Sequence, residues 1–257
     1  MYLIKKKIIL KLANFLSLFW LWIPSRFRRF LFTSFFILES RTEKTSIGLI
    51  NLFKIKDKLE WIINERSIVY DHGIHPKHRL TSYHKFFIDR VNQGDLVLDV
   101  GCGQAIVGCS IARARNKSFV IGIDINKQNI IKGKSLIRKK ELKNIKLIYG
   151  DIYNQKEIKV DKVIISNVLE HINDRRNFIE NLRNITGAKS FLIRVPLFER
   201  DWQLPLRKEL GINYFSDIDH KIEHTIEEFK DEMKKSNLFL KEIYTLYGEI
   251  WANCINE

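Results

Sequence analysis

The chain has 257 residues, of which 45% are hydrophobic and 29% charged, and its formal net charge is +14. This length accommodates one α/β domain with appendages and is too short for two full domains, and the composition is that of a globular protein. Residues 1–45 carry nine Lys or Arg and two Asp or Glu, so half of the net charge lies in this segment. We therefore expect a local anionic partner for the segment rather than a uniformly basic fold.

The three cysteines, Cys102, Cys109 and Cys254, form no CxxC pair and show no metal-ligand spacing. This pattern favours reduced thiols in a cytosolic compartment. We expect a cytoplasmic protein that associates peripherally with the inner face of a membrane.

The N-terminal segment is apolar and flanked by basic residues. Residues 8–23 are mostly apolar, but this run ends at Pro24 and includes a lysine, an asparagine and a serine. It is shorter than the roughly 20 residues of a spanning helix, and no signal-peptide cleavage site follows it. The pattern predicts a helix in the plane of an anionic leaflet, with residues 27–38 as a second apolar patch. Residues 1–38 would contact the membrane; packing on the catalytic domain or a dimer surface is the alternative.

Residues 46–94 are expected to form a helical lid segment. The pattern of residues 49–66 is helical, Gly73 and Pro76 predict a turn, and a helix should begin at about Arg79. The segment also contains four histidines, His72, His75, His78 and His84. Because no cysteine and only one well-placed carboxylate accompany them, we expect these histidines near a polar ligand or on the surface. No metal is predicted.

Residues 95–257 alternate apolar runs with helical patterns, which is typical of a parallel sheet with crossover helices. The predicted strands are residues 95–100, 118–125, 144–152, 160–168 and 189–196, and the predicted helices are residues 105–115, 127–141 and 174–186. Thr225 and Glu228 form the pattern of a capping box at the start of a further helix. Two strands, residues 238–248 and 249–256, close the chain as a hairpin near Gly248.

A glycine-spaced loop follows the first predicted strand in the sequence VLDVGCGQA, residues 97–105. A buried strand that turns through such a loop into a helix presents backbone N–H groups to a ligand. Gly101 can adopt turn dihedrals, and Gly103 allows a cofactor to approach the backbone closely. The loop alone is weak evidence, because the third position of the fingerprint is Ala105 and the spacing is G-x-G-x-A.

Polar groups also end the next three predicted strands. Asp124 ends the second strand, where a carboxylate can accept from both hydroxyls of a ribose. Asp151 ends the third and could accept from an exocyclic amine, and the fourth ends in SNVLEHI, residues 166–172. Because ligands of open α/β sheets bind at the carboxyl ends of the strands, these groups predict one common site. Taken singly, Asp99 could orient the loop, Asp124 could cap a helix and Asp151 could lie in a turn.

Four ordered motifs, VLDVGCGQA (97–105), GIDIN (122–126), YGDI (149–152) and SNVLEHIND (166–174), resemble the class I S-adenosylmethionine-dependent methyltransferases, specifically the type 11 subgroup. The resemblance covers roughly residues 79–250. It implies a Rossmann-like, doubly wound α/β fold with a seven-stranded sheet, mostly parallel with an antiparallel last strand. It implies S-adenosylmethionine as cofactor, with Gly101 and Gly103 facing its methionine part and Asp99 helping to hold its ammonium group.

The same resemblance assigns the remaining cofactor-binding residues. Asp124, with Ile125 beside it, would bind the ribose. Asp151 and Ile152 would bind the adenine, and Asn167 would line the sulfonium pocket.

A hydroxyl acceptor would also need a base, for which histidine suits neutral pH. His171, just past the fourth strand, is the first catalytic candidate. His220 and then His224 follow, in an acceptor-side insertion over residues 197–224. His171 could instead cap a helix or pack against the cofactor, and the other two could be structural. The Asn/Asp-Pro-Pro-aromatic motif of nucleobase N-methylation is absent from this part of the sequence.

We therefore predict a methyltransferase that acts on a small-molecule, lipid or lipid-linked glycan acceptor, since Arg200 and Trp202 suit an acidic or sugar-like molecule. A dinucleotide-dependent oxidoreductase is one alternative, because that fold uses the same loop and ribose acid. A non-catalytic cofactor-binding or RNA-binding protein is another, suggested by the basic composition. Because the basic residues concentrate in an apolar segment, we favour lipid over nucleic acid as a partner.

Overall fold

The computed structural model describes residues 12–13, 15–73 and 75–256. The chain divides into two compact units, Met1–His72 and Gly73–Glu257. The helices are α2 (Ser25–Ser40), α3 (Thr45–Tyr70), α4 (Lys77–Leu80), α5 (Lys85–Arg90), α6 (Ile106–Ala114), α7 (Lys127–Lys139), α8 (Arg175–Thr186), α9 (Gln203–Glu209) and α10 (Ile226–Lys235), with short 3-10 helices η1 (Ile152–Asn154), η2 (Leu169–His171) and η3 (Phe198–Arg200).

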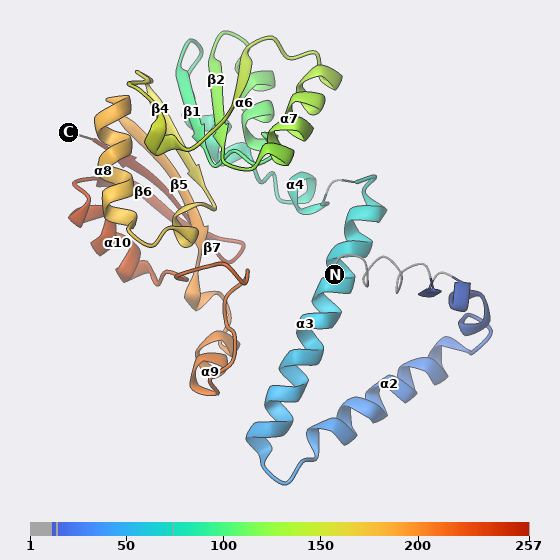
Figure 1. Ribbon diagram of the computed structural model, residues 1–257. Helices are drawn as coiled ribbons and strands as arrows, with labels where there is room; N and C mark the ends of the chain where they lie inside the picture. The colour runs from blue at the N-terminus through green and yellow to red at the C-terminus, as the bar shows by residue number, and fades with distance from the viewer. Residues whose placement is uncertain (1–11, 14, 74, 257) are drawn as a thin grey trace. The chain divides into compact units, whose positions relative to one another are not determined.

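The second unit is built on one seven-stranded sheet with the order β3-β2-β1-β4-β5-β7-β6 (Figure 1). Its strands are β1 (Leu96–Val100), β2 (Phe119–Asp124), β3 (Ile145–Tyr149), β4 (Lys162–Ser166), β5 (Ser190–Pro196), β6 (Phe239–Leu246) and β7 (Glu249–Ile255). Strands β1 to β5 pair in parallel, whereas β7 is antiparallel to both β5 and β6. The strand order reverses between β1 and β4, which is where doubly wound folds bind ligands. The predicted fold class is confirmed.

Successive residues of the central strands alternate between two hydrophobic layers, one on each face of the sheet. In β1, Val97 joins the layer that includes residues of α5, α6 and α7, and Leu98 joins the layer that includes residues of α8 and α10. In β4, Ile164 faces the first layer and Ile165 the second. Because helices cover both faces, these strands are continuous apolar runs in the sequence. This double cover fixes the register of the strands and therefore the positions of their carboxyl ends.

The predicted core elements are present with ends that differ by a few residues, and the capping box at Thr225 and Glu228 is confirmed. One expectation before β1 is wrong: the helix predicted from about Arg79 is broken into α4 and α5. Ser82 has a φ of +49°, which interrupts the helical backbone, and the following Tyr83 is buried. The insertion is also less irregular than expected, because it contains η3 and α9.

The first unit contains α2 and α3, which contact each other. Asn51 of α3 donates a hydrogen bond of 2.7 Å to Glu39 of α2. Every residue of α2, all of them described, is at least partly exposed, although half of this helix is apolar. The predicted in-plane helix lies in part outside the described residues, which begin at Leu12, and residues 15–20 are helical. Among the described residues, no helix combines the length and the hydropathy that crossing a membrane requires.

Candidate functional site

The loop between β1 and α6 is held against two neighbouring strand ends. Cys102 N donates to a backbone carbonyl of β2 at 3.0 Å. Gly101 and Gly103 have φ values of +63° and +54°, in the left-handed region that favours glycine. A Cβ at Gly101 would lie 2.6 Å from the side chain of Val168, so glycine is what allows the loop after β4 to approach. Ala105 also has a positive φ, of +59°, immediately before α6.

Asp99 lies in β1 just before this loop and is only 2% exposed. Its Oδ2 has no hydrogen-bond partner among the described residues. Burial raises the pKa of Asp99 to about 7, although a backbone hydrogen bond from Gly108 and the charge of Arg194 act in the opposite direction. A buried carboxylate with a free oxygen favours a positively charged donor beside it.

Asp124 connects the ends of β1 and β2. Its Oδ2 accepts from Gly103 N at 2.8 Å and its Oδ1 accepts from Asn126 N at 2.7 Å. The side chain that caps α7 is that of Asn126, not that of Asp124. Since each carboxylate oxygen keeps a second lone pair, Asp124 can still accept from hydroxyl groups of a ligand. Ile125, next to it, is 73% exposed.

Asp151 and Ile152 follow β3. The Asp151 side chain accepts from Tyr153 N at 3.0 Å and caps the short helix η1. Ile152 is buried in the hydrophobic layer that includes residues of α8 and α10. An adenine bound at this strand end would therefore meet Asp151 and the backbone around Ile152 rather than the Ile152 side chain.

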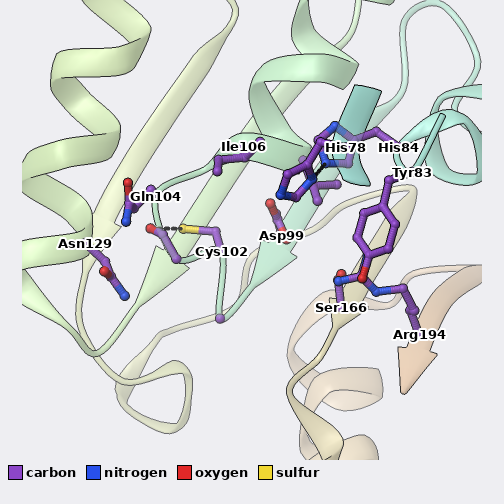
Figure 2. Close-up of a pocket in the computed structure, with 13 residues that line it drawn as sticks. His78, Tyr83, His84, Asp99, Cys102, Gln104, Ile106, Asn129, Ser166 and Arg194 are labelled. Atoms are coloured by element: carbon purple, nitrogen blue, oxygen red, sulfur yellow. Dashed lines mark hydrogen bonds between the residues drawn. The ribbon is translucent and has the colours of Figure 1, made fainter. Parts of the chain in front are cut away.

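A cavity of about 280 Å³, here called the first cavity, lies at the carboxyl end of β1 (Figure 2). It is lined by His78, Tyr83, His84, Asp99, Gly101, Cys102, Gly103, Gln104, Ile106, Val107, Asn129, Ser166 and Arg194. It thus brings together three of the predicted cofactor residues, Asp99, Gly101 and Gly103. The other predicted cofactor residues, Asp124, Ile125, Asp151, Ile152 and Asn167, are not part of its lining.

Arg194 of β5 is a buried cation at the edge of the first cavity. Its guanidinium lies 3.9 Å from the centroid of the Tyr83 ring, and its Nε donates to Asn167 Oδ1 at 3.1 Å. Its Nη1 has no hydrogen-bond partner in the described part of the chain. Tyr83 donates in turn to Glu249 at 2.6 Å. Asn167 has a φ of +56°, an uncommon conformation for a residue with a side chain.

Two of the four histidines before β1 also line the first cavity. His78 Nδ1 lies 3.2 Å from His84 Nε2, and His84 Nδ1 lies 2.8 Å from Ser110 Oγ. Burial, followed by nearby positive charges, lowers the pKa of both histidines to about 4. Both rings are therefore neutral at pH 7 and act as polar lining groups. This agrees with the expectation of histidines near a polar ligand.

A second cavity, of about 360 Å³, has a polar lining. It is formed by Lys77, Asn167, Pro196, Arg200, Ser216, Asp217, His220, Tyr247, Gly248 and Glu249. Asn167 of this cavity is hydrogen-bonded to Arg194 of the first, so the two cavities adjoin at the carboxyl ends of β4 and β5. The insertion over residues 197–224 supplies four of the lining residues.

Comparison with known proteins decides the family. Residues 92–253, more than half of the chain, match the family model described as a methyltransferase domain. The chain belongs to the methyltransferase domain family.

Individual relatives of the methyltransferase are distant. A probable (S)-tetrahydroprotoberberine N-methyltransferase 2 from Papaver bracteatum is 26% identical over 112 residues. The match covers 42% of this chain and 31% of the relative, so the chain spans about a third of that protein. The magnesium protoporphyrin IX methyltransferase of Synechocystis PCC 6803, solved with bound SAH, is similar in structure, with a TM-score of 0.57, 16% identity and coverage of 70% of this chain and 83% of that chain. A SAM-dependent methyltransferase from Aquifex aeolicus has a TM-score of 0.55, 13% identity and coverage of 74% and 98%.

The predicted class is therefore confirmed: this is a class I S-adenosylmethionine-dependent methyltransferase domain. The family match favours this reading over the alternative of a dinucleotide-dependent oxidoreductase. The residues of the first cavity fit the cofactor, because the free, buried oxygen of Asp99 suits an ammonium group and the glycine loop allows close approach.

The methyltransferase places its three candidate catalytic histidines differently. His171, in η2, has its Nδ1 3.1 Å from Asp219 and lines neither cavity. His220 is buried, lines the second cavity and has its Nδ1 3.1 Å from Glu223. Burial lowers the pKa of His220, but the hydrogen bond with Glu223 and the charges of Glu170 and Glu223 outweigh this and raise it. His224 is fully buried against Glu232, which is a structural role.

Sequence reasoning did not identify several residues at the methyltransferase's cavities, among them Tyr83, Arg194 and Glu249. Arg194 left one signal, because it is a charge within the otherwise apolar sequence of β5. Buried charges require partners and often mark functional sites, so this arginine could have been found. Tyr83 and Glu249 follow no pattern in the sequence.

Proposed function

We propose that this methyltransferase transfers a methyl group from S-adenosylmethionine to an oxygen of a small polar acceptor bound in the second cavity. The observation that carries the proposal is that this polar cavity adjoins the first through the Arg194–Asn167 hydrogen bond. Lys77, Arg200 and Asp217 in its lining suit a molecule with several hydroxyl or acidic groups better than a flat aromatic one.

In this mechanism the chain binds and aligns two molecules. S-adenosylmethionine, when bound, supplies a methyl group that its sulfonium already activates. Asp99 would hold the ammonium group, Asp124 the ribose hydroxyls and Asp151 the adenine, while Asn167 would lie near the sulfonium. Since the methyl group is already activated, alignment of the acceptor and exclusion of water are the protein's main tasks, and positioning can supply about 7 kcal/mol or more.

We assign to His220 the role of acting on the oxygen of the acceptor that receives the methyl group. Its Nδ1 lies beside Glu223, which leaves Nε2 available. Glu223 is itself held by Arg200 and by the backbone N–H of Ser216 at 2.6 Å. Burial alone would raise the pKa of Glu223, but the hydrogen bonds from His220 and Ser216 and the charge of Arg200 lower it. His171 remains a further candidate, because its ring is 4.6 Å from that of His220.

We further propose that residues 1–38 bring the methyltransferase to an anionic membrane surface, on the cytoplasmic side. The support is the exposed apolar surface of α2 together with its three arginines. A lipid-linked glycan presents the same hydroxyl groups as a free sugar, and an enzyme held at the membrane would reach it.

Calorimetric titration with S-adenosylmethionine tests the cofactor part of the proposal. Asp124→Ala should weaken binding at least about tenfold, or roughly 1.4 kcal/mol, because the ribose loses its carboxylate acceptor. Asp174→Ala is the matched control, since Asp174 caps α8 and lines neither cavity. The proposal would be overturned if the wild-type chain did not bind S-adenosylmethionine at millimolar concentration, or if it bound NAD instead.

Formation of S-adenosylhomocysteine in the presence of a panel of sugars and sugar phosphates tests the acceptor part. We expect turnover with hydroxyl-rich molecules and its loss in His220→Asn, with binding of S-adenosylmethionine unchanged. Turnover that is equal in wild type and His220→Asn would remove His220 from its assigned role.

A further inference from the structure

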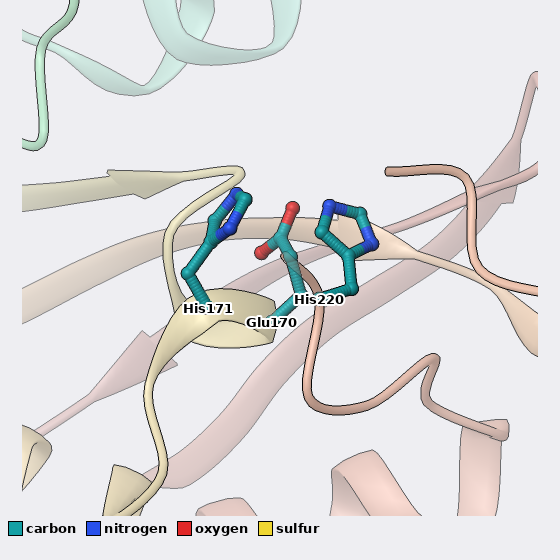
Figure 3. Close-up of side chains that lie close together, drawn as sticks. All are labelled: Glu170, His171 and His220. Atoms are coloured by element: carbon teal, nitrogen blue, oxygen red, sulfur yellow. The ribbon is translucent and has the colours of Figure 1, made fainter. Parts of the chain in front are cut away.

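Glu170, His171 and His220 form a compact cluster beside the second cavity (Figure 3). One ligand atom from each side chain lies within 4.8 Å of the others. Glu170 and His171 belong to η2, at the end of β4, whereas His220 belongs to the insertion. Folding therefore brings together residues that are far apart in the sequence, which is why their order in the chain gives no metal-ligand spacing.

The carboxylate of Glu170 is the unusual member of this cluster. The residue is 0% exposed, and neither of its carboxylate oxygens has a hydrogen-bond partner among the described residues. Figure 3 shows this carboxylate between the two imidazole rings. Burial of a carboxylate without partners is costly unless a cation or a donor completes its bonding. The position of Glu170 therefore indicates a ligand that the protein's own side chains do not supply.

Both histidines are oriented by a second carboxylate. His171 Nδ1 lies 3.1 Å from Asp219 Oδ2, and His220 Nδ1 lies 3.1 Å from Glu223 Oε1. An ionised carboxylate can only accept, so each Nδ1 carries a hydrogen, and in the neutral ring that binds a metal each Nε2 presents its lone pair. Metal-binding histidines have this arrangement, in which an outer carboxylate fixes the tautomer and the ring orientation.

We propose that Glu170, His171 and His220 bind a divalent transition-metal cation through the Glu170 carboxylate and the two histidine Nε2 atoms. Two imidazoles and one carboxylate form a ligand set that suits Zn²⁺, Mn²⁺ or Fe²⁺. Ligand atoms about 2.1 Å from an ion can be up to roughly 4.2 Å apart, so small side-chain rotations would complete the site.

This cation site rests on the proposed function and specifies how the acceptor is activated: the Nε2 atom of His220 binds the cation, and His220 acts on the acceptor's oxygen through that cation. Three protein ligands leave coordination positions open for the acceptor, and His220, which also lines the second cavity, places the cluster beside that cavity. The cation lowers the pKa of the acceptor's hydroxyl, whose proton passes to water. The oxygen's electron pair then forms the bond to the methyl carbon, and the electrons of the broken carbon–sulfur bond remain on sulfur.

A neighbouring group of Asp217, Asp219 and His220 offers a competing set of ligands. Both of its aspartates are exposed to solvent, so water already satisfies them and they need no cation. Asp217 belongs only to this second group, whereas Glu170 belongs only to the first. Variants at these two positions therefore distinguish the two sites.

The experiment is a calorimetric titration of the full-length protein, stripped with a chelator and dialysed, with Mn²⁺ and with Zn²⁺. We expect one cation per chain and at least about tenfold weaker binding in Glu170→Gln, which keeps the shape of the side chain and removes its charge. Asp217→Asn should bind like the wild type, and so should His75→Ala, which controls for a histidine outside the cluster. His171→Ala, at a partly exposed position, is a second loss variant should Glu170→Gln fail to fold.

Absorption of the Co²⁺-substituted protein gives an independent readout, since d–d bands in wild type should disappear in both loss variants. Equal affinity in wild type and Glu170→Gln, or loss of binding in Asp217→Asn, would overturn the cation site. The same experiments distinguish failure of the cation site from failure of the proposed function. A chain that binds S-adenosylmethionine and methylates acceptors without any cation affinity would retain the function and lose this inference. A chain that binds the cation but not S-adenosylmethionine would lose the function.

Discussion

Among the described residues, six of the eleven buried side-chain polar atoms without a hydrogen-bond partner lie at or beside the two cavities. Asp99 Oδ2, Ser166 Oγ and Arg194 Nη1 belong to residues that line the first cavity, and the Glu170 carboxylate lies in the cluster beside the second. Folded proteins pair nearly all of their buried polar atoms, so the unpaired atoms at the cavities are available to bind a ligand. At the scale of single residues, the two cavities are defined by these incomplete contacts as much as by their shape.

Asp99 predicts a pH dependence of cofactor binding. Its pKa of about 7 means that the carboxylate, which attracts the ammonium group, is lost as the pH falls below 7. Affinity for S-adenosylmethionine should therefore rise by roughly tenfold between pH 5.5 and 7, and the rise should end near pH 8, where an α-amino group loses its proton. Calorimetry across this range measures it. Asp99→Asn should bind S-adenosylmethionine more weakly at pH 7, and its affinity should no longer rise between pH 5.5 and 7. A wild-type affinity that is constant over this range would contradict the assignment of Asp99.

Some site residues could be predicted from the sequence because strand ends converge by topology. For this reason the sequence predicts that Asp99, Gly101 and Gly103 lie together, and all three line the first cavity, while their roles toward the cofactor remain predictions. The contacts of Arg194 with Tyr83 could not be predicted, because a cation over a ring depends on packing between β5 and the turn before α5. Roles drawn from the resemblance for Asp151 and Asn167 remain predictions.

At the scale of elements, hydrophobic periodicity identified the strands of the sheet and the helices that pack on it. Each of these elements buries a defined face, so its apolar residues recur with a regular period. It failed at the α4–α5 break, where the pattern continues as a helix but Ser82 takes a left-handed conformation. The break allows Tyr83 and His84 to line the first cavity, so contacts with distant elements outweigh local helix propensity. Such an override cannot be read from a local pattern.

The capping box of α10 gives a prediction about stability. Thr225 Oγ1 accepts from Glu228 N at 3.1 Å, and the Glu228 side chain accepts from Thr225 N at 2.9 Å. Thr225→Ala should lower the free energy of unfolding by about 1 kcal/mol, because a backbone donor of the first turn loses its partner. Urea unfolding measures this change. Glu227→Ala, in the same turn but outside the box, should cost less than about 0.5 kcal/mol, and equal losses would show that the cap contributes nothing.

At the scale of the whole molecule, the chain forms two compact units, Met1–His72 and Gly73–Glu257. The second unit, Gly73–Glu257, contains the sheet, both cavities and the cluster of Glu170, His171 and His220. The first unit carries exposed aromatic side chains beside basic ones, including Trp20, whose ring lies 5.8 Å from the Arg28 guanidinium. The sequence places half of its net charge in residues 1–45, all of which belong to the first unit.

The proposed membrane role of the first unit predicts salt-sensitive binding to anionic vesicles. Each Arg near an anionic surface contributes about 1 kcal/mol, so removing two exposed arginines, Arg26→Ala with Arg29→Ala, should weaken partitioning by about 2 kcal/mol, or roughly 30-fold. Arg28 is kept because it contacts Trp20. Sedimentation of the full-length protein with phosphatidylglycerol vesicles at low and high salt measures the effect. Lys134→Ala with Lys139→Ala removes the same charge from α7 of the second unit and should change little. If both double variants bind equally, attraction comes from the net charge of the whole molecule and residues 1–38 have no special role.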